Sequence, residues 1–71
     1  MEASGNGAHA EGYGTKALAD GAHAEGRGTI AKGAYSHAEG YSTTATSSYS
    51  HAGGYYTIAN VQQVTAIGRF N

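Results

Sequence analysis

The chain has no cysteine, no proline and no tryptophan, and it has only one phenylalanine among its 71 residues. Without cysteine it can form neither a disulfide scaffold nor a thiolate metal site. The absence does not indicate whether the protein works in an oxidising or a reducing compartment. The lack of proline suits uninterrupted backbone hydrogen-bond ladders, because every residue keeps its N–H donor. The fold must therefore be stabilised without covalent crosslinks.

Charged residues and long apolar runs are also scarce. Four lysines and arginines face five acidic residues, so the formal net charge is −1 and we expect no nucleic-acid partner. No apolar run is long enough for a signal peptide or a membrane span, so we expect no membrane insertion. The few large aliphatic residues lie mostly near the C-terminus. A single chain of this composition has little apolar surface to set against an ordering entropy of about 1–2 kcal/mol per residue, so we expect it to oligomerise.

What the chain does contain is a repeat of fourteen residues. The string His-Ala-Glu-Gly begins at His9, His23 and His37, and His-Ala-Gly-Gly begins at His51. A short fixed period indicates structural units stacked on one another, and this length suits one coil of a β-solenoid with two strands and two bends. We expect one domain over residues 1–71, with a partial coil, four full coils and a final partial coil: 1–8, 9–22, 23–36, 37–50, 51–64 and 65–71.

Small residues occupy fixed columns of this repeat. The second and ninth positions are always alanine, the fourth is always glycine, and the seventh is threonine in all four full coils and Asn71 in the last partial coil. These residues alternate with variable ones over positions 1–5 and 7–11, which is the period of a β-strand. We predict that the second, fourth and ninth positions face inward and tolerate no enlargement. The Gly, Ser, Tyr and Asn residues between them suit bends.

Two segments of the repeat resemble a known family. Residues 29–33 (Thr-Ile-Ala-Lys-Gly) resemble the head repeat of YadA-like trimeric autotransporter adhesins, and residues 64–68 (Val-Thr-Ala-Ile-Gly) are similar to its other half. The His-Ala-Glu-Gly variant resembles the form found in phage tail fibres and neck appendages. The resemblance covers the whole chain. It implies an all-β fold, a left-handed parallel β-roll or solenoid of 14-residue coils in which three chains intertwine as a homotrimer.

The resemblance also implies a function. We expect a structural segment of a trimeric surface fibre for host attachment, located on a virion tail fibre or a bacterial cell surface. We do not expect an enzyme, because identical repeated coils provide no unique pocket. The alternative is a lectin-like or matrix-binding head that contacts a host glycan or protein through exposed columns of tyrosine and arginine. The residues of that alternative site are Tyr13, Arg27, Tyr41, Tyr55 and Arg69.

The histidine column is the sharpest chemical feature. Equivalent residues of neighbouring coils stack about 4.8 Å apart in a β-solenoid, so the histidines form a ladder with glutamates on the same face. By the resemblance, this strand faces the trimer axis. The predicted trimer seam consists of His9, Glu11, His23, Glu25, His37, Glu39, His51 and Ile67.

Three interpretations of the ladder remain open. In the favoured one, histidine and glutamate pair within a half-buried seam. In the second, symmetry-related imidazoles on a threefold axis bind zinc or nickel, with His9, His23, His37 and His51 as candidate ligands. In the third, the ladder is solvated and has no role. We expect no cofactor, and we expect His51 to lack a carboxylate partner because Gly53 stands at the glutamate position.

The tyrosine and threonine columns also have two interpretations each. For tyrosine, packing on the neighbour one coil away is favoured over an exposed binding ladder. For threonine, a hydroxyl that closes the bend or bonds the next coil is favoured over an ice-binding face, because only one threonine per coil is fixed.

Overall fold

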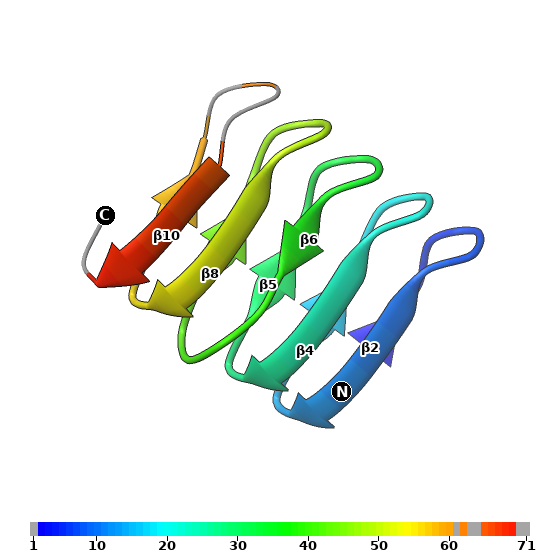
Figure 1. Ribbon diagram of the computed structural model, residues 1–71. Helices are drawn as coiled ribbons and strands as arrows, with labels where there is room; N and C mark the ends of the chain where they lie inside the picture. The colour runs from blue at the N-terminus through cyan, green and yellow to red at the C-terminus, as the bar shows by residue number, and fades with distance from the viewer. Residues whose placement is uncertain (1, 61, 63–64, 70–71) are drawn as a thin grey trace.

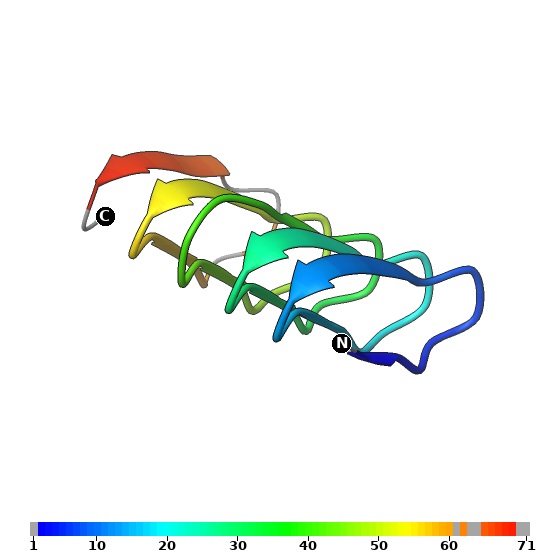
Figure 2. The same ribbon diagram turned by 90° about the horizontal axis from the view of Figure 1, so that it is seen from below.

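The chain winds as a parallel β-solenoid, in agreement with its fourteen-residue period. The computed structural model describes residues 2–60, 62 and 65–69. Two sheets lie back to back and form a flat body with principal dimensions of 28 × 25 × 9 Å (Figure 1, Figure 2). Over the described residues, no helix is long and apolar enough to cross a membrane.

Each coil contributes one strand to each sheet. The sheet that carries the histidines, here called the His sheet, consists of β2 (His9–Tyr13), β4 (His23–Arg27), β6 (His37–Ala38), β8 (His51–Tyr55) and β10 (Thr65–Arg69). The second sheet consists of β1 (Glu2–Ala3), β3 (Lys16–Ala17), β5 (Ile30–Ala31), β7 (Thr44–Ala45) and β9 (Ile58–Ala59). All pairings between these strands are parallel and join each residue to the one 14 positions later. The predicted coil length is therefore confirmed.

Over the residues that the structure describes, only small side chains fill the space between the two sheets. The largest fully buried side chains of the described residues are threonines. The buried hydrophobic residues are Ala17, Ala22, Ala24, Ala31, Ala38, Ala45, Ala52 and Ala59. The prediction that the second and ninth positions face inward is confirmed, because these two columns supply all but one of the buried alanines. The prediction is wrong for the fourth position, whose glycines are exposed and adopt a positive φ that ends the alternation. The coil therefore buries little apolar area for each residue that it orders.

The strands of the second sheet are shorter than the sequence predicts. The alternation of small residues extends over five positions, whereas each of these strands covers two. A tight turn begins at position 11 of the coil: the amide of Ala22 donates to the carbonyl of Ala19 at 3.1 Å, and that of Ser36 to Gly33 at 3.2 Å. Tyr35, the third residue of the second turn, has φ of 59°, the positive value typical of a type II turn. The turn ends the strand after position 9, although the amide at position 10 still donates to the next coil, as that of Lys32 does to the Ala45 carbonyl at 2.8 Å.

The threonine column closes the opposite bend. The hydroxyls of Thr29, Thr43 and Thr57 donate to the backbone carbonyl four residues earlier, at 3.1, 2.9 and 2.9 Å. The predicted bend-closing role is confirmed for these residues, with the bond made inside one coil. Thr15 is equally buried, but its hydroxyl has no hydrogen-bond partner.

This difference inside one column allows a controlled test of the hydroxyl. Thr43→Val keeps the shape of the side chain and removes the donor to the Glu39 carbonyl, so it should lower the free energy of unfolding by about 1–2 kcal/mol. Thr15→Val removes a buried hydroxyl that has no partner and should be neutral or stabilising. Thermal melts by circular dichroism at one protein concentration compare the two. Equal losses of stability would show that the bond to the carbonyl is not what the column requires.

Candidate functional site

The histidines of the four full coils form a continuous stack on the outer face of the His sheet. Strand register places His9 beside His23, His23 beside His37, and His37 beside His51. The ring centroids of successive pairs are 4.7, 4.5 and 4.7 Å apart, and the rings are within 18° of parallel. The predicted ladder is confirmed within one chain. It follows directly from one residue type recurring at an outward-facing strand position.

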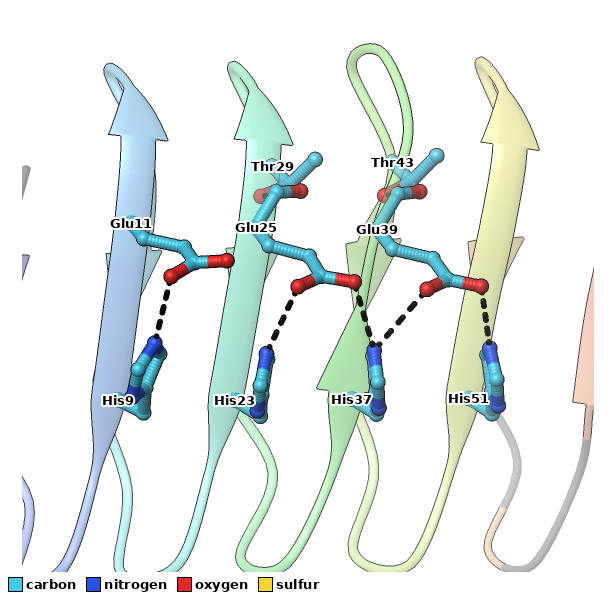
Figure 3. Close-up of polar contacts among 9 residues, drawn as sticks. All are labelled: His9, Glu11, His23, Glu25, Thr29, His37, Glu39, Thr43 and His51. Atoms are coloured by element: carbon cyan, nitrogen blue, oxygen red, sulfur yellow. Dashed lines mark hydrogen bonds and ion pairs between the residues drawn. The ribbon is translucent and has the colours of Figure 1, made fainter.

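A glutamate two residues further along the strand accompanies each of the first two histidines. Nε2 of His9 lies 3.0 Å from Oε1 of Glu11, and Nε2 of His23 lies 3.2 Å from Oε1 of Glu25 (Figure 3). The two side chains of the first pair are 55% and 59% exposed, whereas those of the second are 36% and 33% exposed. Histidine and glutamate are therefore paired within one chain, half-buried in the second pair and largely solvated in the outermost pair.

Glu39 bridges two coils. Its Oε1 lies 3.3 Å from Nε2 of His37, and its Oε2 lies 3.4 Å from Nε2 of His51 (Figure 3). The prediction that His51 lacks a carboxylate partner is therefore wrong. Gly53 leaves a gap where a glutamate would stand, and a Cβ there would lie only 3.3 Å from Oε2 of Glu39. The glutamate of the preceding coil leans into this gap and reaches His51.

His37 lies between two carboxylates. Its Nε2 is 3.3 Å from Glu39 and 3.8 Å from Oε2 of Glu25, yet this nitrogen is shielded from solvent and forms no hydrogen bond. A hydrogen bond from the Glu25 carboxyl group lowers the pKa of Glu39, against a desolvation that raises it. The His51 hydrogen bond and the nearby His37 and His51 charges lower it further. The centre of the ladder is thus an electrostatically coupled group rather than a row of separate pairs.

Two sets of three side chains in this ladder have the donor atoms of a metal site. They are His23, Glu25 and His37, and then His37, Glu39 and His51. Both sets lie within one chain, whereas the sequence suggested a site of symmetry-related histidines on a threefold axis. His9 belongs to neither set. The structure thus brings three of the four candidate ligands together and adds two glutamates that were assigned only to the seam.

The fifth position of the coil forms a second outward column. The guanidinium carbon of Arg27 lies 5.2 Å from the ring centroid of Tyr13 and 5.6 Å from that of Tyr41, and Tyr41 stacks on Tyr55 at 5.2 Å. These four predicted binding residues form one continuous stack, as packing one coil away predicts. The side chain of Arg69, the fifth, lies outside the described residues.

Sequence reasoning missed Tyr56 as part of this aromatic cluster. Its ring meets Tyr55 edge-on at 4.5 Å and Tyr41 at 5.8 Å. The signal was available, because an aromatic residue at the sixth position replaces the glycines of the first two full coils at a bend next to the tyrosine column. Burial and the neighbouring Tyr56 raise the pKa of Tyr55.

A further tyrosine pair lies at the other edge of the solenoid. Tyr35 and Tyr49 stack at 5.5 Å and are 61% and 59% exposed. No pocket is present in the part of the chain that the structure describes.

Comparisons with protein-family models, with curated proteins and with solved structures found no match to this chain. The resemblance to the adhesin head repeat therefore rests on the repeat columns and on the solenoid that they form.

Proposed function

We propose that this chain is a rigid structural segment of a homotrimeric surface fibre that attaches a virion or a bacterium to its host. In this proposal three copies pack side by side as a left-handed β-roll, in the manner of the adhesin heads that the repeat resembles. The segment extends the fibre coil by coil and presents its outer columns to the surroundings. The virion tail fibre and the bacterial cell surface are its two proposed locations.

The size of the buried side chains is the observation that carries this proposal. No described side chain larger than threonine is fully buried, so one solenoid has a core of methyl and hydroxyl groups. Two of its large apolar residues, Ile58 and Ile67, are 53% and 61% exposed. Small folded domains are marginal even when they bury large aliphatic residues. Burial between chains would add the apolar contacts that a single coil stack lacks.

Oligomeric state is the first test. Sedimentation equilibrium over a wide dilution range should give three times the chain mass of 7.2 kDa. Melting temperature should fall on dilution, because dissociation accompanies unfolding of a trimer without a stable monomer. A folded monomer at every concentration would contradict the proposal.

A matched pair of variants tests which face forms the trimer seam. Ile67 lies on the outer face of the His sheet and Ile58 on that of the second sheet, and both are exposed in one chain. Ile67→Glu should weaken the trimer, since it replaces the one apolar residue of the predicted seam by a carboxylate that has no histidine in its own coil, whereas Ile58→Glu should leave the mass unchanged. The opposite result would assign the seam to the second sheet and contradict the seam predicted from the resemblance.

The stacked column of tyrosine and arginine favours one other candidate, a lectin-like or matrix-binding head. Tyr13 is 73% exposed at the end of this column, and Tyr41 and Tyr55 are 37% and 38% exposed. Neighbours cover most ring faces of the column, so sugars would meet ring edges and hydroxyl groups. A glycan array with the intact protein distinguishes the candidates. A spacer should bind no glycan, whereas a lectin should bind one and lose it in Tyr13→Ala.

A further inference from the structure

The two donor sets of the ladder are both assembled by the strand register. His23 and His37 stand side by side on β4 and β6, and His51 follows on β8. Within each set, the three donor atoms all lie within 4.8 Å of one another. Each carboxylate leans towards the next coil. Glu25 therefore lies between His23 and His37, and Glu39 lies between His37 and His51 (Figure 3).

We propose that this ladder binds one divalent transition-metal ion per chain, of the zinc class, at either of two overlapping sites that share His37. Each site supplies two imidazole nitrogens and one carboxylate oxygen. This donor set suits Zn²⁺, Ni²⁺ and Cu²⁺, whereas Mg²⁺ and Ca²⁺ prefer oxygen donors throughout. Three protein ligands leave a fourth position for water. The sites need no second chain, so the proposal does not depend on the proposed trimer.

The nitrogen–oxygen spacing in the ladder is close to that around such an ion. Ligands held 2.0–2.1 Å from a tetrahedral zinc ion are about 3.3–3.4 Å from one another. The nitrogen–oxygen distances are 3.2 Å for His23 with Oε1 of Glu25, 3.3 Å for His37 with Oε1 of Glu39 and 3.4 Å for His51 with Oε2 of Glu39. The 3.8 Å from His37 to Oε2 of Glu25 is longer, and the imidazole rings of each set, 4.5 and 4.7 Å apart, must tilt towards the ion. The second site therefore needs less rearrangement than the first, and we assign it the tighter binding.

His37 limits the number of ions. It belongs to both sets through the same Nε2 atom, which is shielded from solvent and forms no hydrogen bond. One imidazole nitrogen has a single lone pair for a metal, so the two sites exclude each other. In a single chain the side chains of both sets are 33–41% exposed, which leaves an ion access from solvent before the proposed seam covers them. Binding should therefore saturate at one ion per chain.

The chain contains its own control. His9 stacks in the same column and pairs with a glutamate at 3.0 Å, but it belongs to neither donor set. His37→Gln removes a ligand from both sites, whereas His9→Gln makes the same chemical change one coil beyond them. Even the loss of a hydrogen bond to a metal ligand costs about 10–100-fold in metal affinity. We expect at least that loss in His37→Gln and less than about threefold in His9→Gln.

Titration calorimetry of the intact 71-residue protein with zinc chloride and with nickel chloride, near neutral pH, tests the proposal. Saturation at one ion per chain, lost in His37→Gln and kept in His9→Gln, is the expected result. Saturation at two ions per chain, or at one ion per three chains, would overturn it. So would the absence of saturable binding by the folded protein, or equal affinity in both variants.

The unmodified protein provides a second measurement, in case His37→Gln does not fold. Zinc should shift the imidazole NMR signals of His37 and His51 strongly and leave those of His9 in place. A shift of all four histidines to the same extent would indicate binding without a defined site and would overturn the proposal.

Discussion

Gly26→Ala is expected to abolish the folded state. Gly26 has φ of 105°, a backbone conformation that L-residues with a side chain rarely adopt. A Cβ on this residue would also overlap the carbonyl oxygen of Gly40, the equivalent glycine one coil on. The clash is with backbone that forms the ladder, so no side-chain movement relieves it. We expect a loss of about 5 kcal/mol or more, which is comparable with the whole stability of a domain of this size.

Gly14→Ala is the matched control. Gly14 also has a positive φ, 65°, but the atom nearest to its added Cβ is Gly28 N at 4.0 Å. The cost should therefore be that of the left-handed conformation alone, about 1–2 kcal/mol. Circular dichroism and thermal melts at one protein concentration compare the variants. If both melted close to the parent, the glycine column would not mark a close approach of neighbouring coils.

The coil and its inward faces could be predicted because they depend on backbone sterics. Gly26 stands where two backbones meet, and Ala24 and Ala31 stand where two sheets meet, so each column has an upper limit on side-chain size. Such a limit acts on every coil alike and therefore leaves a visible periodic pattern in the sequence. The short strands of the second sheet escaped prediction, because a small residue at position 11 is compatible with a strand or with a turn.

The ladder could be predicted as a column, but its pairing could not. Strand register determines that His51 follows His37, whereas the direction in which Glu39 leans depends on its rotamer and on the empty space at Gly53. From the sequence, Gly53 meant that His51 had no carboxylate partner. In the structure, Gly53 leaves space for the side chain of Glu39 from the preceding coil, which reaches His51. His37 lies between two carboxylates because Glu25 also leans towards the next coil, although a glutamate rather than a glycine stands there.

Stacking on the outer faces is not in itself evidence of function. Because every coil repeats in register, any residue that recurs at an outward position stacks on its copy, as the histidines do at 4.5–4.7 Å. The informative positions are those where a column changes. Arg27 interrupts the tyrosines, Gly53 interrupts the glutamates, and Ile67 replaces a glutamate by an apolar residue. The second proposed metal site, next to Gly53, and the proposed seam at Ile67 both depend on such interruptions.

Ala38→Leu is expected to destabilise the protein strongly through its interior. Ala38 is completely buried and belongs to the same alanine cluster as Ala31 and Ala45 of the opposite sheet. The thinnest dimension of the whole body is 9 Å, and two packed sheets are usually about 10 Å apart. No layer of larger side chains fits between these walls. Overpacking should lower the free energy of unfolding by about 1–3 kcal/mol. We expect a value near the upper end of this range, because the hydrogen-bond ladders on both sides resist separation of the sheets.

The same substitution at Ala34 is the control for this change. Ala34 is only partly buried, in a bend whose equivalent positions hold Asn6, Asp20 and Ser48, so a larger side chain there can extend into solvent. At one protein concentration, Ala38→Leu should lower the melting temperature by about 10–20 °C, whereas Ala34→Leu should change it by only a few degrees. Sedimentation of both variants shows whether the chain association changes as well. An Ala38→Leu protein that melted with the parent would mean that Ala38 faces outward and that the two faces of the His sheet are reversed.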